Sequence, residues 1–479
     1  SLGIDPKSKL WQEGGRPMKN NIILMTDSYK ASHWKQYPKN ANGYFGYIEA
    51  RGTDSDAKAT VFFGLQMFIK KYLMKPFDYQ DIVEAEDFFK AHGEPFNKEG
   101  WEYILDTYKG YIPVTIKAVP EGTVVPLKNA LVTVECTDPK CFWVGSYIET
   151  CLLRAVWYPT TVATNSYECK KVIMDYLEKT SEDPAGAVMF KLHDFGGRGV
   201  SSGESAEIGG AAHLVNFMGS DTVEGVRAMN YYYNGFKMSA FSIPAAEHST
   251  ITAWGKENEV DAYRNMLTQY AKPGALLACV SDSYDIFNAV ENLWGTQLKD
   301  EVIKSGAILV VRPDSGDPVT VVKKCIELLG DKFGYTLNKK GYKVLNYVRV
   351  IQGDGINRNT IQNILGTLYI NGWSADNVAF GMGGALLQQL NRDTFQFAMK
   401  CSAIRIGDEW VDVSKNPVTD AGKKSKAGRL MLYKDTLGNI FTDLEDKVWM
   451  ANKQDMLETV YKNGDIVREY TLDEVRKNA

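Results

Sequence analysis

The sequence has no excess of positive charge. Its 55 lysines and arginines are offset by 59 aspartates and glutamates, so the formal net charge at pH 7 is −4. A chain of this charge has no overall basic field that could hold nucleic acid or an anionic membrane surface, and any polyanion must be bound locally. We therefore expect neither nucleic acid nor a membrane among its partners.

Cysteine pairs are also missing. The seven cysteines are scattered, odd in number and without Cys-x-x-Cys spacing, a pattern that favours reduced thiols in a cytoplasm over a disulfide framework or a structural zinc site. Long apolar runs are absent too. Stretches such as Ala307 to Val311 have the length of a strand, far short of the ~20 residues that a membrane helix needs. We expect a cytoplasmic protein without a membrane span.

The N-terminal residues lack the apolar core of a signal peptide. We expect Met18 to be the native start and residues 1–17 to be a leader or an expression remnant. The rest of the chain can bury a large core, because 44% of its residues are hydrophobic. Its length favours two to three domains, or one large α/β domain with an addition.

A repeated pattern in the middle of the chain predicts the fold class. Each repeat has an apolar strand, then an acidic or glycine-containing loop, then an amphipathic helix. Such repeats begin at Ala275, Ala307, Tyr347 and Asn377, and the stretch from Ala187 to Met218 fits the same pattern. Strands that alternate with helices predict a parallel sheet, either a barrel or a doubly wound sheet, and we favour the barrel. We expect residues 187–394 to form an α/β barrel with its site at the carboxyl ends of the strands.

The flanks have a different composition. Residues 18–186 combine short β-rich runs with a helical patch around Asp81 to His92, and residues 395–479 return to short strands and turns. We expect these two segments to form a second, α+β domain built from both ends of the chain.

Acidic residues follow the predicted strands. Asp282, Asp314 and Asp354 are separated by whole strand–helix repeats, and could bind hydrated magnesium, accept hydrogen bonds from sugar hydroxyls or stabilise a developing cation. Each alone is more often a helix cap or a turn former, but their recurrence at one end of the predicted sheet favours a site. Arg312 adds a donor fork for a carboxamide, carboxylate or phosphate oxygen, or else forms a surface salt bridge.

Glycine-rich loops narrow the choice of ligand. The run from Gly381 to Gly384 comes directly before a helix, so its backbone N–H groups either hold a phosphate or form a plain tight turn. The stretch KLHDFGGRGVSS places Phe195 and Arg198 among glycines. It lacks the spacing of a dinucleotide-binding GxGxxG fingerprint, and no Walker GxxxxGK[ST] loop occurs. A phosphate loop, hydroxyl-binding acids and an aromatic platform together indicate a site for a phosphorylated sugar and a flat base.

Several long strings resemble one enzyme family. They are NIILMTDSYKASHWKQYP, KLHDFGGRGVSS, HLVNFMGSDTVEG, PAAEHSTITAWG, VSDSYDIFNA, RPDSGDP, IQGDGI and GRLMLY. On these strings, from Asn21 to Asn478, the sequence resembles the nicotinamide phosphoribosyltransferases. The resemblance implies an irregular α/β barrel of the type II phosphoribosyltransferase kind and transfer of phosphoribosyl from phosphoribosyl pyrophosphate to nicotinamide. The products are nicotinamide mononucleotide and pyrophosphate, in NAD salvage.

The resemblance also implies ATP as a coupled substrate, hydrolysed through a phosphohistidine, and a homodimer with shared active sites. It implies Mg²⁺ as well, which we expect to be bound mainly by substrate phosphates and water.

Residue roles are likewise implied by the resemblance. The nicotinamide ring is expected between Phe195 and Tyr29 of the other subunit. Asp221 is expected to accept a hydrogen bond from the amide N–H₂ and to repel nicotinate, and Arg312 to bind the amide oxygen. His248 matches the histidine that the family phosphorylates. The other matches are Asp314, Gly353 and Asp354 for the ribose hydroxyls, Gly383 and Gly384 with Arg392 and Lys400 of the neighbouring subunit for the 5′-phosphate, Arg198, Lys415 and Lys423 for the pyrophosphate or ATP phosphates, and His193 and Asp282 for the site in general.

Other interpretations remain open at this point. Taken alone, an aromatic such as Phe195 is more often a core residue, Asp221 resembles a helix N-cap, and His248 is more often structural. Nicotinate phosphoribosyltransferase is the alternative activity, against which Asp221 argues. A non-catalytic binding or signalling protein on the same scaffold would be expected to lose the charged residues, and a barrel hydrolase would leave the aromatic pair unexplained. Gly197 departs from the bulkier residue of close relatives and is expected to loosen its loop.

Overall fold

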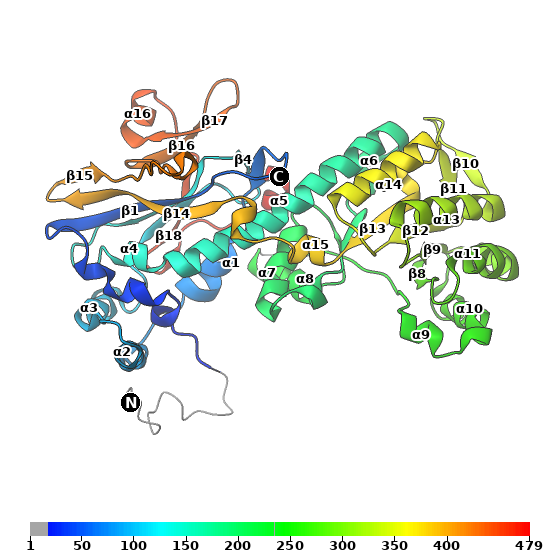
Figure 1. Ribbon diagram of the computed structural model, residues 1–479, viewed down its shortest axis with the longest axis horizontal. Helices are drawn as coiled ribbons and strands as arrows, with labels where there is room; N and C mark the ends of the chain where they lie inside the picture. The colour runs from blue at the N-terminus through cyan, green and yellow to red at the C-terminus, as the bar shows by residue number, and fades with distance from the viewer. Residues whose placement is uncertain (1–17, 234) are drawn as a thin grey trace. The chain divides into compact units, whose positions relative to one another are not determined.

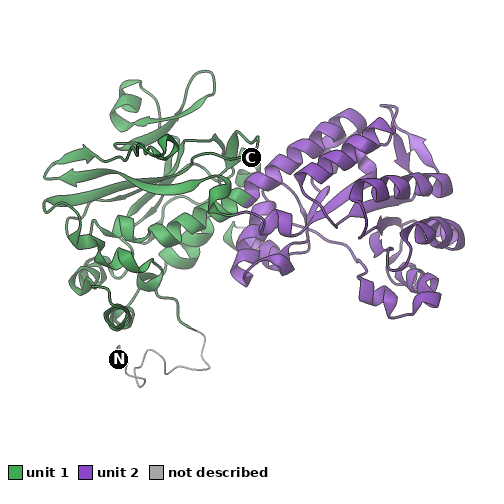
Figure 2. Ribbon diagram, viewed as in Figure 1, with its two compact units in different colours: residues 1–161, 232–234, 391–479 green, residues 162–231, 235–390 purple. Residues whose placement is uncertain are grey.

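The computed structural model describes residues 18–233 and 235–479 (Figure 1), and the predicted leader at 1–17 lies outside these residues. The described chain divides into two compact units (Figure 2). The barrel unit consists of Val162–Tyr231 and Gly235–Leu390. The flanking unit consists of the described residues up to Thr161, a short piece at Tyr232, and Asn391–Ala479. The N-terminal and C-terminal segments therefore share one unit.

The barrel unit contains a sheet of six strands in the order β7-β6-β13-β12-β9-β8, and every neighbouring pair is parallel. Its longer strands are apolar and largely buried, as expected where a parallel sheet is covered on both faces. The strands are β6 Leu192–Asp194, β7 Gly219–Ser220, β8 Leu276–Val280, β9 Ile308–Arg312, β12 Val348–Gln352 and β13 Val378–Met382.

A short segment joins the two edges of this sheet. Phe241 forms a parallel bridge with Gly219 in β7, and Ala245 forms one with Ala278 in β8. We call residues 241–246 the closing segment. Because β7 and β8 are the outer strands of the sheet, the closing segment completes a curled, irregular barrel. The predicted α/β barrel is confirmed.

Side-chain caps start the helices that follow the strands. Asp317 accepts a hydrogen bond from the backbone N–H of Thr320 at the start of α13, and Asn357 accepts one from Thr360 at the start of α14. Such caps satisfy N–H groups that have no partner in the first turn of a helix. The helices of the barrel unit are α6 Pro184–Val188, α7 Gly203–His213, α8 Val223–Tyr232, α9 His248–Thr252, α10 Glu259–Tyr270, α11 Ile286–Asn288 continuing as the π-helix η7 Ala289–Gln297, α12 Lys299–Ser305, α13 Pro318–Phe333, α14 Arg358–Ile370 and α15 Gly384–Leu387, beside a hairpin of β10 Tyr335–Leu337 and β11 Lys343–Leu345.

The helix α5, Glu149–Thr180, runs through the boundary between the units. Its second half bonds to the barrel unit, since the side chain of Asn165 donates to the carbonyl of Ala385 at 2.8 Å. The sequence placed the start of the barrel at residue 187, whereas the observed division begins at Val162. A continuous helix carries no signal of this division, because its packing partners lie far away in the sequence.

The flanking unit is built around a sheet of seven strands in the order β15-β14-β1-β5-β3-β18-β19, antiparallel at each pairing. β1 from the N-terminal segment lies between β5 and β14, and β14 comes from the C-terminal segment (Figure 1). The strands are β1 Ala41–Ala50, β3 Thr115–Ala118, β5 Ala130–Cys136, β14 Phe397–Ile406, β15 Glu409–Asp412, β18 Glu458–Lys462 and β19 Asp465–Ile466.

The other elements of the flanking unit are two short antiparallel strand pairs and several helices. They are β2 Ala59–Val61 with β4 Val124–Pro126, β16 Leu430–Lys434 with β17 Ile440–Leu444, α1 Leu65–Phe68, α2 Tyr79–His92, α3 Lys98–Tyr108, α4 Val144–Tyr147, α16 Glu445–Met450 and α17 Leu472–Asn478. Within residues 18–233 and 235–479, no helix combines the length and the apolar character needed to cross a membrane.

Candidate active site

The carboxyl ends of the barrel strands carry most of the residues that the sequence singled out. Parallel strands end at the same edge of a sheet, so side chains far apart in the sequence can meet there. The residues at this edge are His193 and Asp194 in β6, Asp221 after β7, Asp282 after β8, Arg312 at the end of β9 with Asp314 behind it, Gly353 and Asp354 after β12, and Gly383 and Gly384 after β13.

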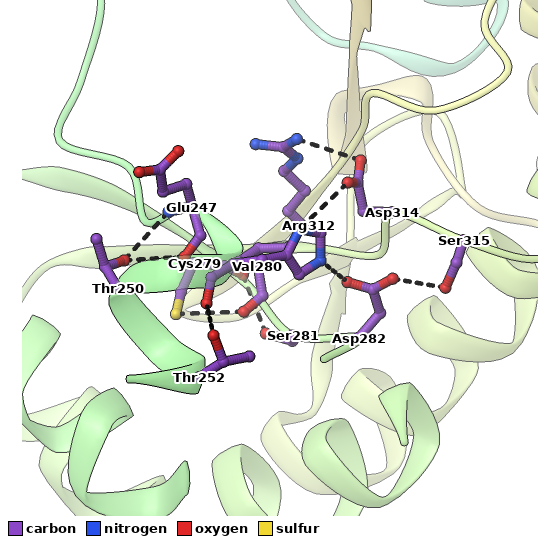
Figure 3. Close-up of polar contacts among 11 residues, drawn as sticks. Glu247, Thr250, Thr252, Cys279, Val280, Ser281, Asp282, Arg312, Asp314 and Ser315 are labelled. Carbon is purple, nitrogen blue, oxygen red and sulfur yellow. Dashed lines mark hydrogen bonds and ion pairs between the residues drawn. The ribbon is translucent and has the colours of Figure 1, made fainter. Parts of the chain in front are cut away.

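His248, the first residue of α9, contacts two of these acids. Its Nε2 lies 2.7 Å from Oδ1 of Asp282, and its Nδ1 lies 3.9 Å from Oδ2 of Asp314. Figure 3 shows the surrounding bonds: the hydroxyl of Ser315 donates to Asp282, and Arg312 donates to Asp314 at 3.2 Å. The imidazole is 47% exposed, whereas the Asp282 side chain is 6% exposed. A buried, oriented carboxylate thus holds an accessible imidazole. Because a carboxylate accepts, Nε2 is the nitrogen that donates to Asp282, and in the neutral ring Nδ1 is then the nitrogen with the free lone pair.

Phe195 forms an aromatic platform over two glycines. A Cβ placed on Gly381 would lie 1.9 Å from Cε2 of the Phe195 ring, and one placed on Gly353 would lie 3.2 Å from it. The guanidinium carbon of Arg312 lies 5.7 Å from the ring centroid. The backbone N–H of Phe195 donates to the carbonyl of Met382 at 2.9 Å. Because Gly381 in β13 and Gly353 after β12 carry no side chains, the Phe195 ring has the space that it occupies.

A cavity of about 580 Å³ lies next to this platform. Its lining includes Phe195, Asp221 and Arg312, together with His193 and Ser242. Most of the other lining residues are apolar, so the cavity combines an apolar body with a few polar groups, as small-molecule sites usually do. The three predicted contacts of a flat amide-bearing ring thus border one space.

Two polar side chains near Asp221, Ser242 and His193, have hydrogen-bond partners that fix their donor and acceptor roles. The hydroxyl of Ser242 donates to Oδ1 of Asp221 at 2.5 Å. His193 places Nε2 2.9 Å from the carbonyl of Phe190, and burial lowers the pKa of His193 below its ordinary value. The imidazole is therefore neutral at pH 7, with Nε2 as the donor to the carbonyl.

Asp194 is a fully buried acid behind the Phe195 loop. It accepts a hydrogen bond from the backbone N–H of Gly196 at 2.7 Å, which shapes the turn that carries Phe195. Burial, with a smaller contribution from the neighbouring charge of Asp221, raises the pKa of Asp194 to about 6. Asp194 therefore supports the turn that carries the platform, and its side chain is not part of the cavity lining.

The predicted phosphate and ribose contacts lie on short turns. Gly383 and Gly384 begin α15, a single turn directly after β13. Gly353 and Asp354 form the loop after β12, where the side chain of Gln352 donates to the carbonyl of Asp354 at 2.8 Å. The exposed Arg198 lies in the 3₁₀ turn Gly197–Gly199. Their roles with a phosphorylated sugar remain predictions.

Five predicted contacts belong to the flanking unit. They are Tyr29 in the 3₁₀ helix η3 Ser28–Lys35, Arg392 in η9 Arg392–Thr394, Lys400 in β14, Lys415 in the loop after β15, and Lys423 in η10 Ala421–Lys423. Tyr29 is 56% exposed. Burial lowers the pKa of Lys400 to about 8, with further lowering by Lys415 and Arg51. The flanking unit therefore brings the cations Lys415 and Arg51 close enough to Lys400 to lower its pKa, against a smaller opposing effect of the Glu149 carboxylate.

Four contributing residues were not assigned from the sequence. They are Asp194, Ser242, Ser315 and Arg51. Asp194 and Ser315 stand next to assigned residues in the motifs HDFG and RPDSG, so motif position could have found them. Ser242 and Arg51 carry no such signal, because their partners Asp221 and Lys400 are distant in the sequence.

Comparisons with known proteins agree on one group. A model described as the nicotinate phosphoribosyltransferase (NAPRTase) family matches residues 190–465, and one described as the nicotinamide phosphoribosyltransferase N-terminal domain matches residues 21–116. A protein of Xanthomonas campestris pv. campestris named nicotinamide phosphoribosyltransferase is 55% identical over 463 residues, covering 96% of this chain and 98% of the relative. One of the same name from Acinetobacter baylyi is 32% identical, covering 95% and 96%.

Solved structures share the fold. The nicotinate-nucleotide pyrophosphorylase of Pyrococcus furiosus superimposes with a TM-score of 0.63 at 15% identity, covering 97% of this chain and 96% of that chain. Human nicotinic acid phosphoribosyltransferase gives a TM-score of 0.53 at 15% identity, covering 95% and 93%. At this identity the likeness concerns the architecture alone.

Proposed function

Because the chain belongs to the nicotinate phosphoribosyltransferase (NAPRTase) family and, within it, to the nicotinamide phosphoribosyltransferases, we propose that it transfers phosphoribosyl from phosphoribosyl pyrophosphate to nicotinamide. The products are nicotinamide mononucleotide and pyrophosphate, in NAD salvage. The observation that carries the choice of substrate is the Asp221 carboxylate on the cavity beside Phe195 and Arg312. A carboxylate accepts a hydrogen bond from an amide N–H₂ and repels the carboxylate of nicotinate.

The reaction needs positioning and charge stabilisation more than proton transfer. The bond between ribose C1 and the pyrophosphate oxygen breaks, and positive charge develops on the sugar. Carboxylates at the strand ends, Asp314 and Asp282 among them, stabilise that charge electrostatically. The pyridine nitrogen of nicotinamide is already a nucleophile, so no general base is required. Stacking on Phe195 and the amide contacts of Asp221 and Arg312 hold the ring in place for attack.

A direct assay tests this function. Nicotinamide and nicotinate are offered separately with phosphoribosyl pyrophosphate and Mg²⁺, each with and without ATP, and the mononucleotide product is quantified by chromatography. Nicotinamide mononucleotide formed in preference to the nicotinate product supports the proposal. Product from nicotinate alone would assign the chain to the acid-using activity, and product from neither would show that it is not a transferase for these bases.

We further propose that ATP phosphorylates His248. The imidazole nitrogen takes the γ-phosphoryl group as the bond to the β-phosphate oxygen breaks, ADP leaves, and water later releases phosphate from the phosphohistidine. The support is the accessible imidazole held by Asp282 at 2.7 Å, because an oriented imidazole with one free lone pair is a competent nucleophile. Phosphorylation is checked by the acid-labile, base-stable label that [γ-³²P]ATP leaves on the chain.

Mg²⁺ fits this site as an ion that the substrates bring. Among the residues that the structure describes, no group of three or more His, Cys, Asp or Glu side chains could hold a metal ion. Mg²⁺ prefers oxygens in an octahedral arrangement and usually keeps several waters together with substrate phosphates. We propose that Asp282 and Asp314 are the carboxylates nearest to such an ion, which would neutralise charge on the pyrophosphate leaving group.

We also propose a homodimer with shared active sites. The support is the exposed ring of Tyr29 and the cation cluster of Lys400, Lys415 and Arg51, in which burial and mutual repulsion lower the pKa of Lys400 to about 8. Phosphate groups of the substrates would relieve that repulsion, with Arg392 and Lys423 as further cations. Mixing two inactive variants, Phe195→Ala and Lys400→Ala, tests the idea, because only a shared site regains activity in mixed dimers.

A cytoplasmic location is the last part of the proposal. All seven cysteines, each among the described residues, are free, and six of them are buried. This supports a reducing compartment. Fractionation of the source cells tests it.

A further inference from the structure

The hydroxyl of Ser242 donates to the acid that faces the cavity. The distance from Ser242 Oγ to Asp221 Oδ1 is 2.5 Å, and both residues line the cavity beside Phe195. Building on the proposed function, we propose that Ser242 is a positioning residue that holds the Asp221 carboxylate toward the amide of nicotinamide and so sharpens the choice of amide over acid.

The backbone builds this contact from two distant segments. The N–H of Phe241 donates to the carbonyl of Met218 at 2.8 Å, and the carbonyl of Phe241 accepts from the N–H of Ser220 at 3.2 Å. Ser242 directly follows Phe241 in the closing segment, and Asp221 directly follows Ser220 in β7. The closing segment and β7 therefore bring the hydroxyl to the carboxylate by main-chain hydrogen bonds, which fix the register of the two segments.

The other end of the closing segment is also anchored. The N–H of Ala246 donates to the carbonyl of Ala278 at 3.0 Å, and the N–H of Ala278 donates to the carbonyl of Pro244 at 2.9 Å. A segment held at both ends keeps Ser242 in one place. Its hydroxyl is thus a fixed donor and not a side chain on a free loop.

A fixed donor determines how the carboxylate can serve a ligand. A carboxylate has two oxygens and turns about its Cβ–Cγ bond unless a partner holds it. The Ser242 bond occupies Oδ1 and leaves Oδ2 as the acceptor for an amide N–H. His193 nearby is neutral at pH 7, and Asp194 adds negative charge behind Asp221. Neither of these two neighbours supplies a cation that would attract the carboxylate of nicotinate. Arg312 on the same cavity can bind an oxygen of either base, so the orientation of Asp221 is what separates them.

The hydroxyl is tested with a matched pair of variants. Ser242→Thr keeps the hydroxyl, and Ser242→Val has the same shape as threonine without it. Ser242 is exposed to the cavity, so both β-branched side chains have room. Ser305→Ala is the control, because Ser305 in α12 loses a local hydrogen bond of 2.7 Å to Val302 without touching the cavity. Steady-state kinetics with nicotinamide and nicotinate are measured, together with nicotinamide binding by calorimetry.

We expect the valine variant, but not the threonine variant, to bind nicotinamide more weakly. Ser242→Val raises KM and Kd for nicotinamide about tenfold, as for loss of a hydrogen bond to a charged group, with kcat within about twofold. It lowers the ratio of kcat/KM for nicotinamide over nicotinate by a similar factor. Ser242→Thr and Ser305→Ala stay within about twofold of the wild type.

Other results overturn the proposal. Equal nicotinamide Kd values for the threonine and valine variants would show that the hydroxyl does not act. If Ser242→Val lowers kcat/KM equally for nicotinamide and nicotinate and also lowers the melting temperature, the role of Ser242 is structural alone. If the wild type makes no nicotinamide mononucleotide, the proposed function fails, and the calorimetric comparison of the two variants still decides the Ser242 contact.

Discussion

The Phe195 platform depends on the absence of a side chain at Gly381. A Cβ at this position would lie 1.9 Å from the ring carbon Cε2 and 2.1 Å from Cδ2, whereas ordinary contact begins at 3.4 Å. In Gly381→Ala the ring or the strand must therefore move by about 1.5 Å. β13 lies between β6 and β12 in the sheet, so its backbone is the more constrained of the two, and we expect the ring to move toward the cavity.

A shift of this size is large for a stacking contact. Misplacement by about 1 Å can cost on the order of a hundredfold in rate, so we expect kcat/KM for nicotinamide to fall by about that factor. Overpacking of this kind typically costs about 1–3 kcal/mol of stability, which thermal unfolding will show. The milder Gly353→Ala, with its Cβ 3.2 Å from the ring, is expected to lose less activity because a few tenths of an ångström of movement suffice.

A double variant tests whether Gly381→Ala lowers activity by displacing the Phe195 ring. Phe195→Leu removes the ring, so adding Gly381→Ala to it is expected to cost little more activity, and the two losses are then strongly non-additive. Steady-state kinetics of the wild type, both single variants and the double variant form the complete cycle. Fully additive losses would refute the idea that Gly381 exists to make room for this ring.

Three further predictions concern the charged groups. Asp221→Asn is expected to lower the preference for nicotinamide over nicotinate by about tenfold or more, because the repelling charge is gone; unchanged preference in competition assays would contradict the role of Asp221. Asp282→Asn is expected to cut labelling of His248 by ATP by on the order of a hundredfold, since the ring loses its orienting carboxylate, and undiminished labelling would refute this. Lys400 has its pKa lowered to about 8, so it is charged below pH 8 and loses its proton above it. KM for phosphoribosyl pyrophosphate should therefore rise between pH 8 and 9 in the wild type but stay flat in Lys400→Arg, and parallel profiles would argue against a phosphate contact.

The barrel and most of its site were predictable because their signals are local. Apolar strands followed by polar loops and helices repeat along the chain, and parallel strands that end at one edge must gather Asp282, Asp314 and Asp354 there. His248 and Asp282 both stand in motifs that the sequence displays, but their contact was not predicted, because the two residues are far apart in the chain. Capping explains part of the same pattern: Asp317 and Asn357, which also follow strands, start helices.

By itself, the sequence determined the fold class, the family and the residue types at the strand ends, because these depend on periodicity and on motifs of a few residues. The tertiary structure decided which side chains are partners across long separations. Only the folded chain shows that Ser242 reaches Asp221, that residues 241–246 join β7 to β8, and that Gly381 makes space for Phe195. Each of these depends on the relative position of segments that no local pattern encodes, since packing is set by the whole sheet and not by the neighbouring residues.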